Sequence, residues 1–512
     1  MFFGSSSSGS PSRTTSEMAM KTDASHTLLL PLDRVLAGAP HVLIIGSGPA
    51  GVSVTEYLYN VFPEATIAIL ERGDVLTLTH VNNVFPDQEV RGPFIDAHGT
   101  WPWKGYFENN GLMIFALGGR GIVAGGHLRR FEKDDFVLWK NGKWPLLPSE
   151  LDRFFTVAEI VRNVSPGEFE SRAQTWAMGV LDEFKPHPPP WGIDVRTTGL
   201  RRGLDSSAQR LCELIHRDCL EAHEKALLKG EKNWGQYRRI LVSTNTRVVK
   251  LDVEHGRVTN LACQNLGQLK DVGIGDSMVV LAASPIESAR LILDSNLDHE
   301  LGLVAAGKYL AEHILCRTEI TVFFPIQDPW DARLNVVIPP PGRELRQRFQ
   351  IDVRQSAVPV KNGKLCLRIS GFAAMDPNEN NRIEIDGSDV RTIIELSHAD
   401  HVRVDAMKET MIEIAERLGA KELPAPEVAK GRSNHEVGTL RMGTSKANSV
   451  TDTNGKVHDM ENLFVADASV FPCAGVANPM LTITALAYHL AQHVGRTIGL
   501  KEVPSSEPWS LC

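Results

Sequence analysis

The sequence predicts an α/β protein in which a parallel-sheet domain, built from separated segments, carries an inserted domain based on an antiparallel sheet. Three observations predict this fold class. Near the N-terminus an apolar strand, a Gly-rich turn, a helix and a second strand follow one another, as in a β-α-β unit. Residues 315–395 alternate apolar and polar side chains between Pro-rich breaks, a pattern typical of antiparallel strands. The chain has 512 residues, which is too long for one simple core.

The β-α-β unit lies at residues 41–73 and contains a dinucleotide fingerprint. "HVLII" is followed by "GSGPAG", a helix over 52–62 and the strand "ATIAILERG". Gly46 permits the tight turn, Gly48 lets the backbone approach a pyrophosphate at the helix N-terminus, and Gly51 allows close helix packing. Glu71 ends the second strand 20 residues after Gly51, where an acid accepts a hydrogen bond from a ribose hydroxyl. The motif predicts a dinucleotide site without distinguishing NAD from FAD.

The later elements follow in the order that a discontinuous domain requires. A strand-rich block covers 237–265, and 276–296 reads as a buried strand, a turn and a helix. An amphipathic helix is expected over 400–419 and a hairpin-like stretch over 450–469. A final helix is expected to start at Asn478 as N-cap and to stop at Gly495.

These elements predict two domains and a tail. The Ser-rich N-terminus lacks the apolar segment of a signal peptide and is expected to be disordered. The expected division is a disordered segment 1–38, a nucleotide-binding domain of 39–130, 201–300 and 426–500, and a substrate-binding domain of 131–200 and 301–425.

Composition excludes several classes of protein. A net charge of −8 gives no indication of nucleic-acid binding. Seven scattered cysteines without a CxxC pair argue against a disulfide framework and a zinc site, so a reduced, cytoplasmic setting is expected. The uncharged run 468–495 is interrupted by Pro472, Gly475 and Pro479, which leaves less than the roughly 20 apolar residues of a membrane span. A loop followed by a buried helix is expected instead.

Two further segments are candidates for the site, each with a plain structural alternative. "LGGRGIVAGGHLRRF" (117–131) is rich in glycine, which indicates backbone passing close to a flat ligand or to another backbone. Asp467 ends an apolar strand and is either a helix cap or a ligand for ribose or ribityl hydroxyls. The apolar first turn of the last helix indicates a buried N-terminus, which favours an anion. Asn478 at that turn is either part of the site or only a cap.

His435 lies in "SNHEVGTLRMG", among small and flexible residues. The residues alone allow three readings: a metal ligand, a catalytic base or a buried histidine with satisfied hydrogen bonds. No cluster of His, Cys or carboxylate residues at ligand spacing accompanies it, so no metal site is expected. The other two readings stay open at this point.

Together these motifs resemble those of the glucose–methanol–choline (GMC) flavin oxidoreductases. The matching pieces run in family order over about residues 40–497, and the resemblance is closer to the branch of pyranose oxidases, cholesterol oxidases and bacterial sugar oxidoreductases. They are "VLIIGSGPAGVSVTEYL…ILERG", "LGGRGIVAGG", "KWPLLPSELDRFF", "VVLAASPIESARLIL", "GKYLAEHI", "NHEVGTLRMG" and "ENLFVADASVFPCAGVANPMLTITALA".

The resemblance implies a Rossmann-like FAD-binding domain with an inserted substrate domain. It implies FAD as cofactor, with His435 and Asn478 as the catalytic pair. Val123 stands where pyranose oxidases carry the histidine that bonds FAD covalently, so non-covalent FAD is expected. His127, four residues further on, is assigned either a contact with flavin or substrate or a structural role. The residues expected to bind the cofactor are Gly46, Gly48, Pro49, Ala50, Gly51, Glu71, Arg72, Gly118, Gly119, Gly125, Gly126, His127, Val248, Ala283, Asp467, Ala468, Asn478, Pro479, Met480 and Leu481.

The resemblance also implies a reaction. Oxidation of an alcohol removes a proton from oxygen and a hydride from carbon, and His435 suits the first task. The expected partners are a small-molecule alcohol, on a sugar, glycoside or polar natural product, and oxygen or another electron acceptor; the sequence does not indicate the oligomeric state. A second class stays open: some proteins of this fold are lyases that release cyanide from hydroxynitriles and keep FAD as a structural element. Four tryptophans are candidates for stacking on a sugar or for the core: Trp101, Trp103, Trp144 and Trp191.

Overall fold

The computed structural model describes seven stretches of the chain. They are residues 29–84, 88–166, 171–194, 203–325, 329–356, 363–504 and 506–511; residues 88–91, 166, 191–194, 203, 329 and 330 are described by their backbone alone.

The centre of the molecule is a five-stranded parallel sheet in the order β21-β11-β1-β2-β7. Its strands come from three distant parts of the chain, as the sequence predicts: β1 (Val42–Ile45) and β2 (Ile67–Leu70), then β7 (Ile240–Ser243) and β11 (Met278–Leu281), then β21 (Leu463–Val465). All five strands are buried along their length, which explains their continuous apolar sequences. The predicted Rossmann-like parallel sheet is thereby confirmed.

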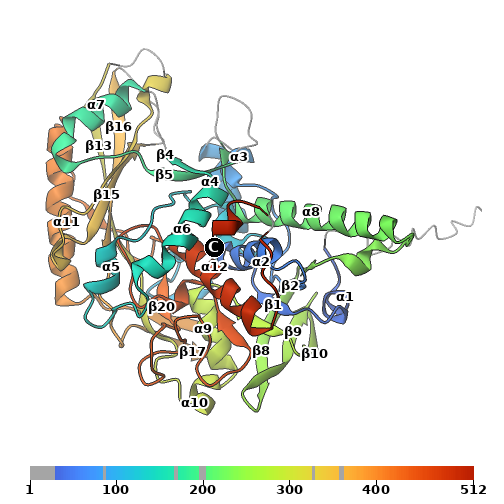
Figure 1. The fold of residues 1–512 in the computed structure, drawn as a ribbon. Helices are drawn as coiled ribbons and strands as arrows, with labels where there is room; N and C mark the ends of the chain where they lie inside the picture. The colour runs from blue at the N-terminus through green and yellow to red at the C-terminus, as the bar shows by residue number, and fades with distance from the viewer. Residues whose placement is uncertain are drawn as a thin grey trace, which may run out of the picture.

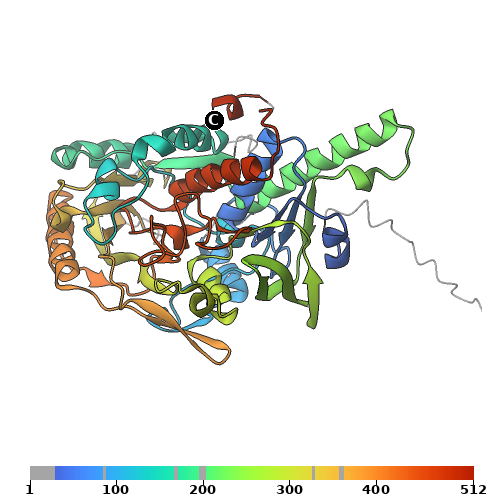
Figure 2. The same ribbon diagram turned by 60° about the horizontal axis from the view of Figure 1, so that its bottom comes forward.

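Two helices pack together behind the fingerprint turn. α2 (Pro49–Val61) follows β1, and α12 (Met480–Thr497) lies beside it, drawn in red next to blue in Figure 2. The last helix differs from the prediction at both ends. Asn478 precedes the helix without capping it, and Gly495 lies inside the helix. A Cβ at position 495 would come within 2.4 Å of the Phe62 ring. Gly495 therefore serves close helix packing rather than helix termination.

The inserted part is built on an antiparallel sheet in the order β14-β15-β16-β13-β19. Helix α11 (His398–Arg417) covers one face of it, at the left edge of Figure 1. Gly371 in β16 allows this contact, since a Cβ there would lie 2.6 Å from Met407 Sδ. The strands are β13 (His313–Phe323), β14 (Asn335–Ile338), β15 (Phe349–Gln355), β16 (Lys364–Ala374) and β19 (Glu427–Val428). The predicted antiparallel sheet is confirmed.

A mixed sheet in the order β20-β12-β17-β18-β3 joins the two parts. Its strands are β3 (Trp103–Gly105), β12 (Lys308–Ala311), β17 (Arg382–Asp386), β18 (Asp389–Ile393) and β20 (Val437–Thr439). The sheet therefore takes strands from both of the predicted domains. β20 begins two residues after His435 and fixes the backbone on that side of the histidine.

The start of the described chain differs from the expected disordered tail. α1 (Leu32–Ala37) is helical, with Leu32 and Val35 buried, and the Leu30 N–H donates to the carbonyl of Val242 in β7. The apolar side chains of this turn cover the edge of the central sheet, which is the physical reason for its order. Residues 1–28 lie outside the described part of the chain.

The remaining elements surround these sheets, and α8 projects from the body of the molecule in both views (Figures 1 and 2). They are α3 (Val81–Val84), α4 (Gln88–His98), α5 (Lys133–Val137), α6 (Pro148–Val161), α7 (Arg172–Val180), α8 (Ser207–Leu228), α9 (Pro285–Asp294), α10 (Leu297–Leu301), β4 (Val164–Pro166), β5 (Pro190–Asp194), β6 (Gly203–Leu204), β8 (Thr246–Glu254), β9 (Arg257–Asn265) and β10 (Gln268–Gly273).

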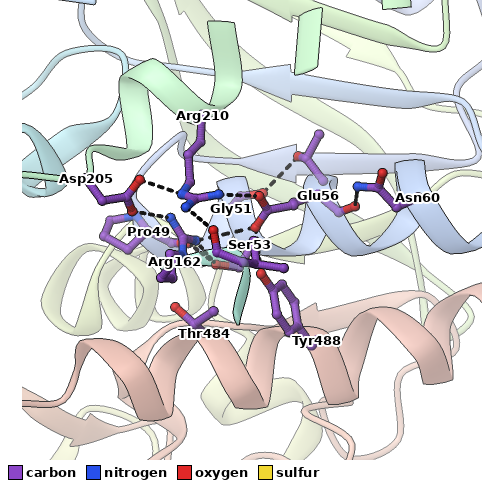
Figure 3. A network of polar contacts seen from close by, with 12 residues as sticks. Pro49, Gly51, Ser53, Glu56, Asn60, Arg162, Asp205, Arg210, Thr484 and Tyr488 are labelled. Carbon is purple, nitrogen blue, oxygen red and sulfur yellow. Dashed lines mark hydrogen bonds and ion pairs between the residues drawn. The ribbon is translucent and has the colours of Figure 1, made fainter. Parts of the chain in front are cut away.

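A buried polar network holds α2 in place (Figure 3). Glu56 on α2 pairs with Arg210 of α8 at 3.0 Å and accepts a hydrogen bond of 2.6 Å from the hydroxyl of Tyr488 on α12. Arg162, at the end of α6, donates to Ser53, whose hydroxyl donates to the carbonyl of Pro49. Three helices are thus tied to α2, whose first turn carries the fingerprint.

No helix within the described ranges combines the length and apolar character needed to cross a membrane. The described cysteines, Cys212, Cys219, Cys263, Cys316, Cys366 and Cys473, are all free thiols.

Candidate active site

One cavity of about 490 Å³ lies over the carboxyl ends of the central strands and extends to His435 and Asn478. Ligands in open α/β folds bind at this edge of the sheet. It brings together residues separated by up to about 430 positions in the chain, from the fingerprint to the start of α12. The predicted site residues on its wall are Gly46, Gly48, Pro49, Ala50, Glu71, Arg72, Gly119, Gly125, Gly126, His127, Val248, Ala283, His435, Asp467, Ala468, Asn478, Pro479 and Met480.

Three predicted residues lie behind this wall. Gly51 supports the turn, because a Cβ there would lie 2.1 Å from the carbonyl oxygen of Gly46. Gly118 has a φ of +91° and abuts Ala208 at the start of α8. Leu481 is fully buried in the apolar core. All three shape the site through packing rather than by facing the cavity.

The fingerprint turn has the shape of a phosphate cradle. Gly46 has a φ of +104°, and a Cβ there would come within 2.5 Å of the Ala282 carbonyl oxygen. A Cβ on Gly48, by contrast, would meet no protein atom within 4 Å, so the backbone there borders open space. α2 begins at Pro49, and its free N–H groups face this space with the positive end of the helix dipole.

Glu71 links the fingerprint to the second Gly-rich segment. Its Oε2 accepts hydrogen bonds from Ser47, at 3.0 Å from the backbone N–H and 2.6 Å from the hydroxyl, and its Oε1 accepts from the Gly73 N–H at 2.9 Å. The hydroxyl of Ser47 in turn accepts from the N–H of Gly118 at 3.0 Å. Burial raises the pKa of the Glu71 carboxyl, against the lowering effect of these hydrogen bonds.

Asp467 has the first of the two roles that the sequence left open, that of a cap, and it also lines the cavity. It accepts from the backbone N–H of Ser469 at the 3-10 turn 468–470, and also from the N–H of Ser284 and the hydroxyl of Ser288. Ser284 lines the cavity with a φ of +90°, and its own hydroxyl has no hydrogen-bond partner among the described residues. Asp467 therefore caps a turn and holds a strained, unsatisfied serine against the cavity.

The residues around this part of the cavity fit the dinucleotide FAD. A dinucleotide needs a turn without side chains, an acid for a ribose and hydrogen-bond donors for phosphate. The open space at Gly48, the buried carboxylate of Glu71 and the unpartnered hydroxyl of Ser284 meet these needs.

At the other end of the cavity, His435 and Asn478 face each other. Nε2 of His435 lies 3.1 Å from Nδ2 of Asn478, and Gln350 Nε2 donates to Oδ1 of Asn478 at 3.2 Å. Burial lowers the pKa of His435 well below 6.5, and unfavourable electrostatic interactions with His313, Arg120 and His127 lower it further. His435 is therefore a neutral base at neutral pH, while Asn478 offers an amide donor beside it.

The loop that carries His435 is fixed on both sides. Glu312 accepts hydrogen bonds from the Gly431 N–H at 3.0 Å and from the Ser433 hydroxyl at 2.5 Å. On the other side, Glu436 forms a two-pronged ion pair with Arg120 of the Gly-rich segment. The position of His435 thus depends on buried polar groups from three segments.

His127 lies on the cavity wall near His435, with Nδ1 3.7 Å from Oδ2 of Asp352. Burial lowers the pKa of His127 to about 3, so the ring is neutral at neutral pH. Asp352 and Gln350 lie two residues apart on β15 and so point to the same face of the strand. The inserted sheet therefore places two polar side chains behind His127 and Asn478, although neither of them lines the cavity.

The tryptophans divide between the two readings. Trp103 is buried and donates to Glu287 at 2.9 Å, and Trp144 is buried against Phe136 and Phe471, so both belong to the core. Trp101 is 40% exposed and is not on the cavity wall. Trp191 is described by its backbone alone. Of the two alternatives, Trp103 and Trp144 therefore belong to the core.

Sequence reasoning missed several residues that the fold brings to the site. Ser47 was the variable position of the fingerprint, and Arg120 and Glu436 carry no motif of their own. Gln350 and His313 lie in strands of the inserted sheet, and only "GKYLAEHI" around His313 gave a signal. Among the described residues, no group of three or more His, Cys, Asp or Glu side chains is placed to hold a metal ion.

A dinucleotide cradle and a buried histidine–asparagine pair on one cavity define a dinucleotide-dependent enzyme. Residues 377–487 match the family model described as GMC oxidoreductase. Over this segment, which carries His435 and Asn478, the chain is similar to the GMC oxidoreductases, and the similarity implies FAD as its cofactor.

Known proteins similar to this chain agree with that assignment. Paromamine 6'-oxidase of Streptomyces fradiae is 26% identical, over 88% of this chain and 91% of its own length. C-glycoside 3-oxidase of Microbacterium trichothecenolyticum is 24% identical, over 91% and 98%. The crystal structure of pyridoxine 4-oxidase from Mesorbium loti superposes with a TM-score of 0.63 at 16% identity, covering 89% of this chain and 99% of that one. The last comparison concerns the fold alone.

Proposed function

We propose that this enzyme oxidises an alcohol on a sugar, glycoside or polar natural product to a carbonyl. The observation that carries the proposal is the His435–Asn478 pair, whose facing nitrogens lie 3.1 Å apart at one end of the cavity. A hydroxyl oxygen that approaches both nitrogens from the cavity side and replaces their direct hydrogen bond would donate its proton to Nε2 of His435 and accept from Nδ2 of Asn478. The names of the paromamine and C-glycoside oxidases support a glycoside substrate.

In this proposal each side chain has one task. His435 removes the hydroxyl proton, for which a buried, neutral imidazole is suited. Asn478, oriented by Gln350, holds the oxygen so that the carbon lies at a fixed position. Bound FAD supplies the hydride acceptor. A proton held on His435 would also stabilise negative charge on oxygen or another electron acceptor in the cavity.

The polar groups at this end of the cavity support a neutral, hydroxyl-rich substrate. His127 is uncharged, and Asp352 lies behind it, where burial raises the pKa of its carboxyl and Arg354 Nη2 lies 3.3 Å from Oδ2. A substrate with several hydroxyl groups would find both donors and acceptors there. A sterol would leave these buried polar groups unpaired.

We also propose that FAD is bound non-covalently. Val123 lines the cavity where the family's covalent branch carries histidine, and the valine side chain has no nucleophilic atom. Acid precipitation of the holoenzyme is expected to release all flavin into the supernatant. Flavin absorbance that stays with the pellet would contradict the proposal.

The test of the reaction is anaerobic mixing of the holoenzyme with sugars, glycosides, amino alcohols and aromatic alcohols. A substrate should bleach the yellow absorbance of the flavin. His435→Ala, with FAD retained, should slow this bleaching by about 10²- to 10⁴-fold, and His401→Ala, on the exposed face of α11, should not slow it. Bleaching at the original rate in His435→Ala would refute the base assignment. Cyanide release from a hydroxynitrile without any bleaching would favour the lyase reaction instead.

A further inference from the structure

His313 is a buried residue that the proposed reaction does not use. It is the first residue of β13, it is 1% exposed, and it does not line the cavity. Its ring stands perpendicular to that of His435, with an interplanar angle of 89° and a centroid distance of 4.9 Å. The two Nδ1 atoms are 2.8 Å apart, and Nε2 of His313 lies 2.5 Å from the carbonyl oxygen of Gly475.

The chain of contacts has a single consistent arrangement of protons when both rings are neutral. A carbonyl oxygen only accepts, so Nε2 of His313 must carry the hydrogen that points at Gly475. A neutral imidazole has one N–H, so Nδ1 of His313 is left as an acceptor. The hydrogen between the rings therefore belongs to Nδ1 of His435. Nε2 of His435 is then unprotonated and faces Asn478 and the cavity.

The surroundings keep His313 neutral and in place. Burial lowers the pKa of His313 to about 4, and the nearby positive charge of Arg129 adds to this effect. The backbone of His313 pairs with Ala374 in β16, and the preceding Glu312 binds the loop before His435. The acceptor Nδ1 is therefore presented to His435 by a rigid strand rather than by a loop.

We propose that His313 is a positioning residue that selects the Nδ1–H tautomer of His435 and so keeps Nε2 free as the base. This inference rests on the proposed function of His435. Without His313 the Nε2–H tautomer would compete, and that form has no lone pair facing the substrate hydroxyl. After proton transfer from the substrate oxygen to Nε2, the Nδ1–H of the His435 cation still donates to His313, which stabilises the charge.

The experiment compares three forms of the holoenzyme: the original chain, His313→Leu and His313→Gln. Leucine removes the acceptor. Glutamine carries an acceptor oxygen and an N–H donor on one planar group, as the neutral ring does. Each form is labelled with ¹⁵N-histidine, and the His435 signals are assigned by their loss in His435→Ala. The ¹⁵N shifts of an imidazole report which nitrogen carries the hydrogen, without substrate or turnover.

We expect His435 to carry its hydrogen on Nδ1 in the original chain and in His313→Gln, and on Nε2 to a substantial degree in His313→Leu. Anaerobic flavin reduction at saturating substrate should be about 10- to 100-fold slower in His313→Leu and within about threefold of the original rate in His313→Gln. The substrate concentration for half-saturation should change little.

Two results would overturn the inference: an Nε2–H tautomer in the original chain, or an unchanged tautomer in a folded His313→Leu that retains FAD. If leucine prevents folding, the original chain and His313→Gln still decide: an Nε2–H tautomer in the original chain, or a slow His313→Gln that keeps the Nδ1–H tautomer, contradicts the inference. Failure of the proposed function is seen separately. In that case His435→Ala reduces flavin at the original rate, whatever tautomer the NMR signals show.

Discussion

Arg120 and Glu436 meet in a two-pronged ion pair between segments that are 316 residues apart. Nη1 of Arg120 lies 3.0 Å from Oε1 of Glu436, and Nη2 lies 2.6 Å from Oε2. Arg120 belongs to the Gly-rich turn beside the cofactor cradle, and Glu436 directly follows His435. The pair thus ties the position of the proposed base to the Gly-rich segment that is expected to bind the cofactor.

Removal of one partner of this buried pair should destabilise the protein more than removal of one partner of an exposed ion pair. Arg120→Met leaves the fully buried carboxylate of Glu436 without its partner, which costs roughly 3–5 kcal/mol in comparable buried pairs. We expect a lower melting temperature and slower flavin reduction. Differential scanning fluorimetry and anaerobic stopped-flow absorbance measure both, with the exposed pair of Arg382 and Glu384 as control through Arg382→Met. Equal effects of the two substitutions would contradict the linkage.

Glu71 is expected to set the affinity for FAD. Its buried carboxylate is held by Ser47 and Gly73 and would accept a hydrogen bond from a ribose hydroxyl. Glu71→Ala should weaken FAD binding by about 10- to 100-fold, as loss of a hydrogen bond to a charged group does. Titration of the apoprotein with FAD, followed by flavin fluorescence, measures the change. Glu64→Ala, at an exposed position before the same strand, should bind FAD as tightly as the original chain.

The network under α2 is expected to contribute to stability rather than to chemistry. Glu56 contacts Arg210 and Tyr488 and is nearly fully buried (Figure 3). Glu56→Leu leaves the guanidinium of Arg210 without one of its two carboxylate partners, Asp205 being the other, and we expect a loss of about 3–5 kcal/mol in the free energy of unfolding. Urea denaturation of the holoenzyme measures it. The rate of flavin reduction by saturating substrate in the folded fraction should stay within about twofold, and a large loss of that rate would place the network in the reaction instead.

The sequence predicts the central sheet well, because its information is local. The strand before Gly46, the acid at Glu71 and the continuous apolar strands are each visible in a short window. The parallel sheet assembled from three segments, and the antiparallel sheet of the inserted part, follow from such windows and from the resemblance. Asn478 shows the limit of this reasoning: its sequence context suits a helix cap, but the side chain instead contacts His435 and Gln350.

The parts that the sequence does not predict are those set by contacts between distant segments. Nothing local in "LAEHILC" indicates that His313 meets His435, since 122 residues separate them and the pairing of β13 with β16 decides where the ring points. The same holds for Gln350 on β15. Trp103 and Trp144 are ambiguous for a related reason: composition does not distinguish an aromatic core from a sugar platform, and only packing does.

The rate of flavin reduction should decrease at acid pH and stay constant at and above neutral pH. Burial lowers the pKa of His435 well below 6.5, and the groups facing it are His313 from β13, His127 and Arg120 from the Gly-rich segment, and Asn478. The neutral, competent form therefore predominates at and above neutral pH. We expect a constant rate from about pH 6.5 upward and a fall only on further acidification. Stopped-flow reduction at saturating substrate measures this profile, and a rate that falls as the pH is lowered from 8 to 7 would contradict the assignment of the base.

The ionisation of Glu312 should make the stability of the fold decrease as the pH rises, whereas the rate of flavin reduction decreases as the pH falls. Burial raises the pKa of its carboxyl from 4.5 to about 7, although hydrogen bonds from Ser433, Tyr106 and the Gly431 N–H oppose the shift. A group whose pKa is raised on folding stabilises the fold below its unfolded pKa, and this stability is lost as the pH rises through the folded pKa. The window is therefore pH 4.5 to 7, and a shift of this size corresponds to roughly 3 kcal/mol.

Glu312→Gln removes the titration and keeps an acceptor oxygen for the loop before His435. We compare the melting temperature of Glu312→Gln minus that of the original chain at two pH values. We expect this difference to be larger at pH 8 than at pH 5. Melting curves of both holoenzymes between pH 5 and 8 measure the effect, with Glu319→Gln, at a half-exposed carboxylate further along β13, as the matched control. Parallel curves for the original chain and Glu312→Gln would show that the carboxyl of Glu312 is ionised throughout this range, and that the loop is held by a buried charge rather than by a shared proton.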